Sequence, residues 1–231
     1  MGYRMKGLTV IPLQKELDFF IQGCAEQGLA METSTLGRIP ITYLPDLDLT
    51  LAQGGLGKAQ FAVQTQHLID CGEGWEVVIC AGAAGALDDR LSIGDVVVGT
   101  QTVEYDIHNK FGKPLLPQFG SAESIVEEFR RIEMADASFK LHVGGIASGD
   151  EDVVDVGRRR EVRELTGALA NAWEGAGGAR ASAFSHVPFV EIRGISDGAN
   201  ETAAHDFAKN LRITMRNVAL VVTRWAGRHL S

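Results

Sequence analysis

The sequence has little cysteine, no long hydrophobic run and no strong cluster of positive charge. Its three cysteines are odd in number and far apart, without a CxxC or Cys/His cluster, so neither a disulfide framework nor a zinc site is expected. No apolar stretch approaches the roughly 20 residues that a membrane helix requires, and the apolar stretch at 7–13 is too short for a secretory signal. These absences predict a protein of the reducing cytoplasm that does not bind a membrane.

The charge balance narrows the range of partners further. Lysine and arginine total 22 against 30 aspartate and glutamate residues, which gives a net charge of −8 at pH 7. Nucleic acids attract clustered lysine and arginine, whereas the basic run here is only 158–160 and is followed by Glu161. We therefore expect a small-molecule partner and no nucleic acid. The chain of 231 residues, 45% of them hydrophobic, is long enough for a single domain spanning 1–231.

Short apolar runs alternate with helical patterns along the chain, which is typical of the α/β class. Strands are predicted at 8–11, 31–36, 39–44, 47–52, 75–80, 95–99 and 187–197, and helices from 13, over 59–71 and over 201–229. The small residues 81–87 are predicted to form a loop whose backbone N–H groups face a ligand. The last helix carries an apolar stripe at helical spacing that would cover one sheet face: Phe207, Leu211, Met215, Val218, Val222 and Trp225.

A glycine-rich segment at 53–58 follows a predicted strand and precedes a helix, where a phosphate-binding loop would lie. Its spacing does not fit, because Gly54 and Gly57 are only three residues apart and Ala59 stands where serine or threonine is needed. We therefore interpret these glycines as positions where the loop packs closely against the sheet.

Two acidic residues stand where open α/β sheets bind ligands. Glu174 opens a helix of small residues, and Asp197 ends an apolar strand just before Gly198. Carboxylates at the carboxyl ends of strands make a candidate site. Simpler roles also fit the spacing, because Asp197 could form an Asx turn or a helix cap and Glu174 could complement a helix dipole.

Five segments, in one order along the chain, resemble the purine nucleoside phosphorylase and nucleosidase superfamily. They are VIPLQKEL (10–17), the small-residue segment with SIGDVVVG (81–99), VGGIASGD (143–150), AWEGAGGARA (172–181) and EIRGISDGAN (191–200). The chain looks most like the bacterial methylthioadenosine/S-adenosylhomocysteine nucleosidases. The resemblance implies a three-layer α/β/α fold with a central mixed, partly barrel-like sheet. It also implies hydrolysis of the bond between ribose and a purine, without metal or cofactor, by a homodimer.

The same resemblance implies roles for individual residues. Asp197 would protonate the purine, Glu16 would activate the attacking water, and Glu174 would bind the ribose hydroxyls. The chemistry is compatible, since cleavage leaves a base that needs a proton and a sugar that water must attack. The remaining substrate-binding positions are Trp173, Arg193, Ser196, Gly82, Ala83, Val153 and Phe207, although Phe207 fits the core stripe equally well.

Phosphorolysis is the first alternative, and it requires cations that hold a phosphate dianion. The position of the phosphorylase arginine is Cys80 here, Arg90 lies past the small-residue segment, and Lys15 offers only one flexible ammonium group. Water is therefore favoured as the nucleophile. A nucleoside-binding regulator without catalysis is a second alternative.

Three departures from the nucleosidases bear on the substrate. Where they carry a stacking phenylalanine, a methionine and a serine, this chain has Asp152, Trp173 and Ala83. These changes suggest a related substrate, such as futalosine or another 5′-modified adenosine. The segment 102–120 is predicted to be a loop, from which Tyr105 or His108 could reach the neighbouring subunit's pocket.

Overall fold

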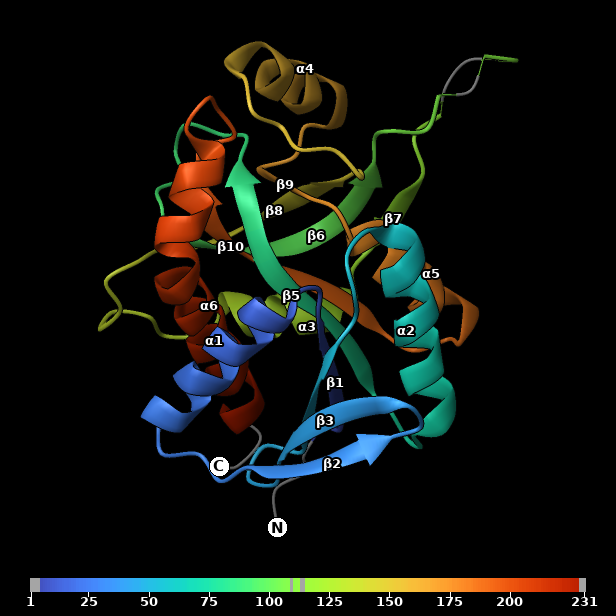
Figure 1. Ribbon diagram of the computed structural model, residues 1–231, viewed down its shortest axis with the longest axis vertical. Coiled ribbons are helices and arrows are strands. Elements are labelled where there is room, and N and C mark those ends of the chain that lie inside the picture. Colours follow the sequence, from blue (N-terminus) through green and yellow to red (C-terminus); the bar gives the residue numbers. More distant parts are fainter. Residues whose placement is uncertain (1–4, 109, 113–114, 229–231) are drawn as a thin grey trace.

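The computed structural model describes residues 5–108, 110–112 and 115–228, whose course Figure 1 shows. Strands and helices alternate along this course, which confirms the α/β class. In chain order the elements are β1 (Gly7–Ile11), α1 (Gln14–Glu26), β2 (Glu32–Leu36), β3 (Ile39–Leu44), β4 (Leu49–Gln53), α2 (Lys58–Cys71), β5 (Val77–Ala86), β6 (Val96–Glu104), β7 (Gln118–Gly120), α3 (Glu123–Arg130), β8 (Leu141–Ser148), α4 (Val156–Thr166), β9 (Ala170–Ala172), α5 (Gly175–Phe184), β10 (Phe189–Asp197) and α6 (Ala203–Gly227).

The strands form one mixed sheet that closes partly on itself. β1 runs parallel to both β4 and β5, and β5 runs parallel to β10. From β10 the pairing continues through β6 and β8 to β9, which pairs back onto β5 and closes a ring of five strands. β3 and β2 extend the open side beyond β4. This topology confirms the predicted mixed, partly barrel-like sheet.

Helices cover the sheet on opposite sides. In Figure 1, α1 and α6 lie together on one side and α2 and α5 on the other, which confirms the three layers. The apolar stripe of α6 faces the core as its spacing predicts: Leu211, Met215, Val218, Val222 and Trp225 are fully buried. The predicted end of this helix, His229, lies outside the described residues.

The small residues 81–87 are not the loop that we expected. β5 continues through them to Ala86 and pairs with β10 on one side, Gly82 opposite Arg193, and with β9 at its end. Alanine and glycine have low strand propensity, but pairing on both sides overrides local preference. The segment 102–120 is likewise partly strand, because β6 ends at Glu104 and β7 begins at Gln118.

No helix in the described part of the chain has both the length and the apolar character needed to cross a membrane.

Candidate active site

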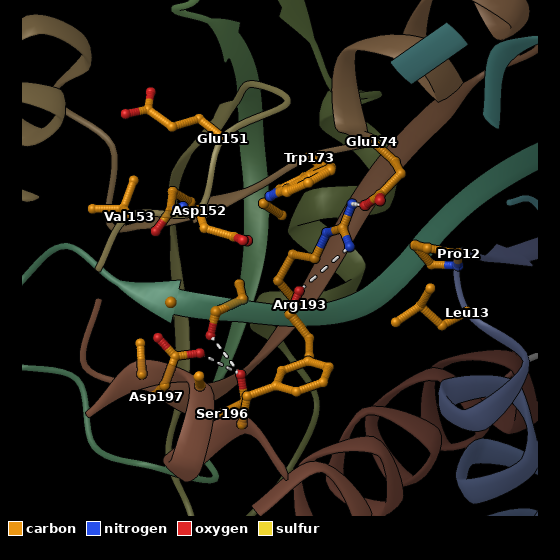
Figure 2. A pocket seen from close by; sticks show the side chains of 18 of the residues that line it. Pro12, Leu13, Glu151, Asp152, Val153, Trp173, Glu174, Arg193, Ser196 and Asp197 are labelled. Carbon is orange, nitrogen blue, oxygen red and sulfur yellow. Dashed lines mark hydrogen bonds and ion pairs between the residues drawn. The ribbon is translucent and has the colours of Figure 1, made fainter. Parts of the chain in front are cut away.

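A cavity of about 430 Å³ lies where β1, β5 and β10 end. These three strands are parallel, so their carboxyl ends meet at one edge of the sheet. Nine of the ten predicted site residues line the cavity: Glu16, Ala83, Val153, Trp173, Glu174, Arg193, Ser196, Asp197 and Phe207. Figure 2 shows the cavity with the Ser196–Asp197 pair at one end and the Glu174–Arg193 pair at the other.

Glu16 reaches the cavity from the first turn of α1, directly after β1. Its Oε2 accepts a hydrogen bond from the Leu13 N–H at 3.0 Å, and its Oε1 accepts one from the Ala83 N–H at 2.8 Å. Burial raises the pKa of the Glu16 carboxyl to about 7; the Ala83 hydrogen bond opposes this rise and the Glu174 carboxylate adds to it. Such a carboxyl can take up or release a proton near neutral pH.

Glu174 lies at the N-terminal end of α5, but its side chain does not cap the helix. Its Oε1 accepts a hydrogen bond from the Gly57 N–H at 3.2 Å, and its Oε2 lies 3.4 Å from Arg193 Nη2. Burial raises the pKa of Glu174, whereas Arg193 acts to lower it. The side chain is thus held by contacts across the site, which the helix-dipole interpretation does not explain. The Gly57 contact also occupies an N–H of the glycine-rich segment.

Arg193 is almost completely buried, and its guanidinium joins two carboxylates. Its Nε donates to Glu191 Oε1 at 2.8 Å, and its Nη2 contacts Glu174. Its other nitrogens donate to the Ala83 carbonyl at 3.4 Å and to Cys80 Sγ at 3.3 Å. We did not predict Glu191 as part of this network. The sequence did carry a signal, because residues two apart on a strand share a face.

Asp197 ends β10 and is also buried. Its Oδ2 accepts a hydrogen bond from Ser196 Oγ at 2.8 Å, and its Oδ1 accepts one from the Ala199 N–H at 2.9 Å, so the predicted Asx turn is present as well. Burial raises the pKa of the Asp197 carboxyl, the two hydrogen bonds act against that rise, and the nearby Asp206 and Asp152 add to it. A raised pKa favours the protonated form, which can donate a proton.

Trp173 stands in the middle of the cavity wall. In Figure 2 it lies between the Glu174–Arg193 pair and Asp152. Ser148, at the end of β8, holds the backbone there, because its Oγ donates to the Trp173 carbonyl at 2.7 Å and accepts from the Ala176 N–H at 3.0 Å.

Val153 and Phe207 add apolar surface to the cavity. Val153 is buried in the same apolar cluster as Tyr105, and Phe207 is half-buried, lining the cavity while it contacts the core. Both interpretations of Phe207 therefore apply. Tyr105 is only 2% exposed, packed within its own chain, so it is not available to a neighbouring subunit; His108 is exposed.

Gly82 is the predicted site residue that does not line the cavity. A side-chain carbon at this position would come within 2.5 Å of Arg193 Nη1 and 3.3 Å of Glu16 Oε1. Glycine is needed there to leave room for these two side chains. The neighbouring Ala83 N–H, which we expected to face a ligand, donates to Glu16 instead.

The cavity lining is acidic. It contains five carboxyl groups, from Glu16, Glu151, Asp152, Glu174 and Asp197. Among the described residues that line it, Arg193 is the single cation. Lys15 is exposed outside the lining, and Arg90 is paired with Asp88. Within the described ranges, no group of three or more histidine, cysteine or acidic side chains is placed to hold a metal ion.

Comparison with known proteins places the chain in a family. The model of the phosphorylase superfamily matches residues 12–225. A 5′-methylthioadenosine/S-adenosylhomocysteine nucleosidase of Marinomonas sp. (strain MWYL1) is 32% identical over 76% of this chain and 79% of its own length. The nucleosidase of the same name from Staphylococcus aureus (strain JH9) is 30% identical over 71% of this chain and 75% of its own.

Solved structures agree with this relationship. The Neisseria meningitidis nucleosidase in complex with methylthio-immucillin-A has a TM-score of 0.82 and 27% identity, over 97% of this chain and 100% of that one. The Colwellia psychrerythraea nucleosidase in complex with adenine has a TM-score of 0.85 and 25% identity, over 98% of this chain and 96% of that one. Futalosine hydrolase of Helicobacter pylori shares the fold, with a TM-score of 0.84 and 23% identity over 97% of this chain and 98% of that one. The chain therefore belongs to the phosphorylase superfamily, and it is an enzyme that hydrolyses N-glycosidic bonds.

Proposed function

We propose that the substrate is a 5′-modified adenosine, such as methylthioadenosine or S-adenosylhomocysteine, and that Glu16, Glu174 and Asp197 carry the reaction. One observation supports this above all: these three buried carboxyl groups, from three separate parts of the chain, line a single cavity. Cleavage of the bond needs a proton on the departing purine and an activated water on the sugar, so two separated carboxyl groups meet the chemical demand.

Asp197 is the acid in this proposal. Its raised pKa favours the protonated form, and Ser196 holds its Oδ2 in place at 2.8 Å. The proton passes to N7 of the purine as the bond between C1′ and N9 breaks, which makes the base a better leaving group.

Glu16 is the base. Its pKa of about 7 lies near neutral pH, where a general base accepts a proton from water most effectively while still being partly ionised. The N–H groups of Leu13 and Ala83 fix both carboxylate oxygens, so the group is oriented before substrate enters.

Glu174 accepts hydrogen bonds from the ribose hydroxyls. Its own position is fixed by Gly57 and Arg193, and the side chain lines the cavity. A negative charge beside the sugar also stabilises the positive charge that develops on the ring as the base departs.

The charge of the lining favours water over phosphate. Five carboxyl groups would repel a phosphate dianion, and Arg193 is already bound to Glu174 and Glu191. A phosphorylase needs free donors for that dianion, whereas water needs only the Glu16 base.

Two relatives at 30% and 32% identity are methylthioadenosine/S-adenosylhomocysteine nucleosidases, which supports an adenosine derivative. Asp152, Trp173 and Ala83 all line the cavity, so the three departures from the nucleosidase pattern lie where substrate would bind. We propose that Trp173 supplies the main apolar surface against the nucleoside, which alters the range of 5′-substituents accepted.

We further propose that the chain acts as a homodimer. Leu56 lines the cavity yet is 51% exposed, and Ile107 and Leu115, in the 105–117 segment, are 39% and 89% exposed. We propose that these side chains belong to one apolar patch, because contiguous apolar patches mark interaction surfaces. Light scattering on the purified protein tests this, with the mass of two chains expected and that of one chain contradicting it.

A substrate panel tests the proposed function. Methylthioadenosine, S-adenosylhomocysteine, 5′-deoxyadenosine, futalosine and inosine are incubated with the enzyme, with and without phosphate, and released base is measured. We expect release of adenine at the same rate in both buffers. Turnover that requires phosphate, or release of hypoxanthine from inosine in preference to adenine, would refute the proposal.

A further inference from the structure

Asn171 is a buried polar residue on the cavity wall to which neither the sequence nor the family resemblance gave a role. It is the central residue of β9, opposite Gly85 of β5 and Ala147 of β8. Its neighbours Ala170 and Ala172 pack in an apolar cluster, and Ala172 also lines the cavity. Asn171 is 6% exposed and lines the cavity.

The amide oxygen of Asn171 has no hydrogen-bond partner in the described part of the chain. A buried acceptor without a donor destabilises a fold, and natural proteins contain few of them. An apolar residue would fill the position without that cost. The amide is therefore explained best by a donor that arrives with the ligand.

The geometry places this oxygen beside the proposed acid. A side-chain carbon on Gly85 would lie 2.9 Å from Asn171 Oδ1 and 3.0 Å from Asp197 Oδ1. Both oxygens therefore lie close to Gly85, and Gly85, Asn171 and Asp197 all line the cavity. A ligand group that reaches this part of the cavity meets two acceptors, so it must carry N–H or O–H donors.

We propose that Asn171 is a substrate-binding residue whose Oδ1 accepts a hydrogen bond from the exocyclic amino group at C6 of the purine. This inference rests on the proposed function. The amino group carries two N–H donors, which suits a space flanked by two oxygens. Hydrogen in place of this amino group would leave Asn171 Oδ1 buried without a donor. Asn171 thus selects 6-aminopurine nucleosides, together with Asp197.

The test compares wild type with Asn171→Leu on two substrates, methylthioadenosine and its analogue with hydrogen in place of the 6-amino group. A buried hydrogen bond of this kind changes kcat/KM by about 10- to 100-fold. We expect the wild type to prefer the amino substrate by that factor. Asn171→Leu should lose most of this preference, because the substitution lowers kcat/KM for the amino substrate and leaves kcat/KM for the analogue nearly unchanged. Equal losses on both substrates, or no loss on either, would overturn the inference.

Two further variants serve as a backup and as a control for this comparison. Asn171→Val, β-branched and suited to a strand, provides a second removal of the amide if the leucine variant does not fold. Ser182→Ala is the matched control, since Ser182 is also buried with an unpartnered oxygen but lies outside the cavity lining. It should keep the wild-type preference for the amino substrate.

Calorimetric binding of free adenine and unsubstituted purine separates this inference from the proposed function. If the wild type cleaves neither nucleoside, the proposed function fails, while a preference for adenine that disappears in Asn171→Leu still supports the role of Asn171. If the wild type cleaves methylthioadenosine and both proteins distinguish adenine from purine equally well, the inference alone fails.

Discussion

Replacing Glu16 with glutamine should make the protein more stable at high pH while it abolishes turnover. Burial raises the pKa of this carboxyl from 4.5 to about 7. Between these values the folded protein binds the proton more tightly than the unfolded chain does. The stability of the wild type therefore falls relative to the variant as the pH rises through this window. Each tenfold change in proton affinity corresponds to about 1.4 kcal/mol, so ionised Glu16 costs about 3 kcal/mol above pH 7.

Glutamine removes this cost but introduces another. Its amide nitrogen must face the N–H of either Leu13 or Ala83, which sacrifices one hydrogen bond worth about 1 kcal/mol. That loss is the same at every pH. The change with pH is therefore the decisive quantity. The free energy of unfolding of Glu16→Gln minus that of wild type should grow by about 2–3 kcal/mol from pH 5 to pH 9.

Urea unfolding at several pH values measures this difference. Glu73→Gln, at an exposed loop position, is the matched control for the loss of one carboxyl group. A difference between Glu16→Gln and wild type that does not change with pH would refute the reasoning, because the carboxyl would then be ionised without cost.

Three further predictions concern the same site. For wild type, kcat/KM on methylthioadenosine should rise with pH as Glu16 ionises, with a midpoint near its pKa of about 7; a profile that stays flat from pH 5 to pH 8 contradicts the base assignment. Asp197→Asn should lower kcat by about 10²- to 10⁴-fold while adenine still binds in calorimetry, and wild-type turnover would rule out the acid role. Glu191→Gln leaves Arg193 with one carboxylate partner and should destabilise the fold by about 3 kcal/mol in urea unfolding; an unchanged midpoint would show that the buried pair contributes nothing.

Local pattern in the sequence predicts much of this fold. The stripe on α6 and the short apolar runs of β1, β3 and β10 carry their periodicity in neighbouring residues, so they could be recognised without coordinates. β5, like the segment 102–120, was an exception. Its second half has side chains no larger than methyl, and only pairing with distant strands keeps it extended.

For the candidate site too, sequence patterns predict some residues and miss others. Glu174 and Asp197 stand at element ends, where a local pattern and the family resemblance both drew attention to them. The Gly57 contact with Glu174 joins positions 117 apart, and no periodicity encodes such a pair. Asn171 lies in a strand of three residues, too short to show alternation, so its place on the cavity wall emerged only from the structure.

The central claim is that water, activated by Glu16, attacks the sugar while Asp197 protonates the purine. Turnover of methylthioadenosine in ¹⁸O-labelled water containing unlabelled phosphate, quenched early and analysed by mass spectrometry, tests it most directly. The account predicts free methylthioribose with one ¹⁸O atom at C1 and unlabelled adenine. A sugar 1-phosphate, or a sugar without the label, would contradict it.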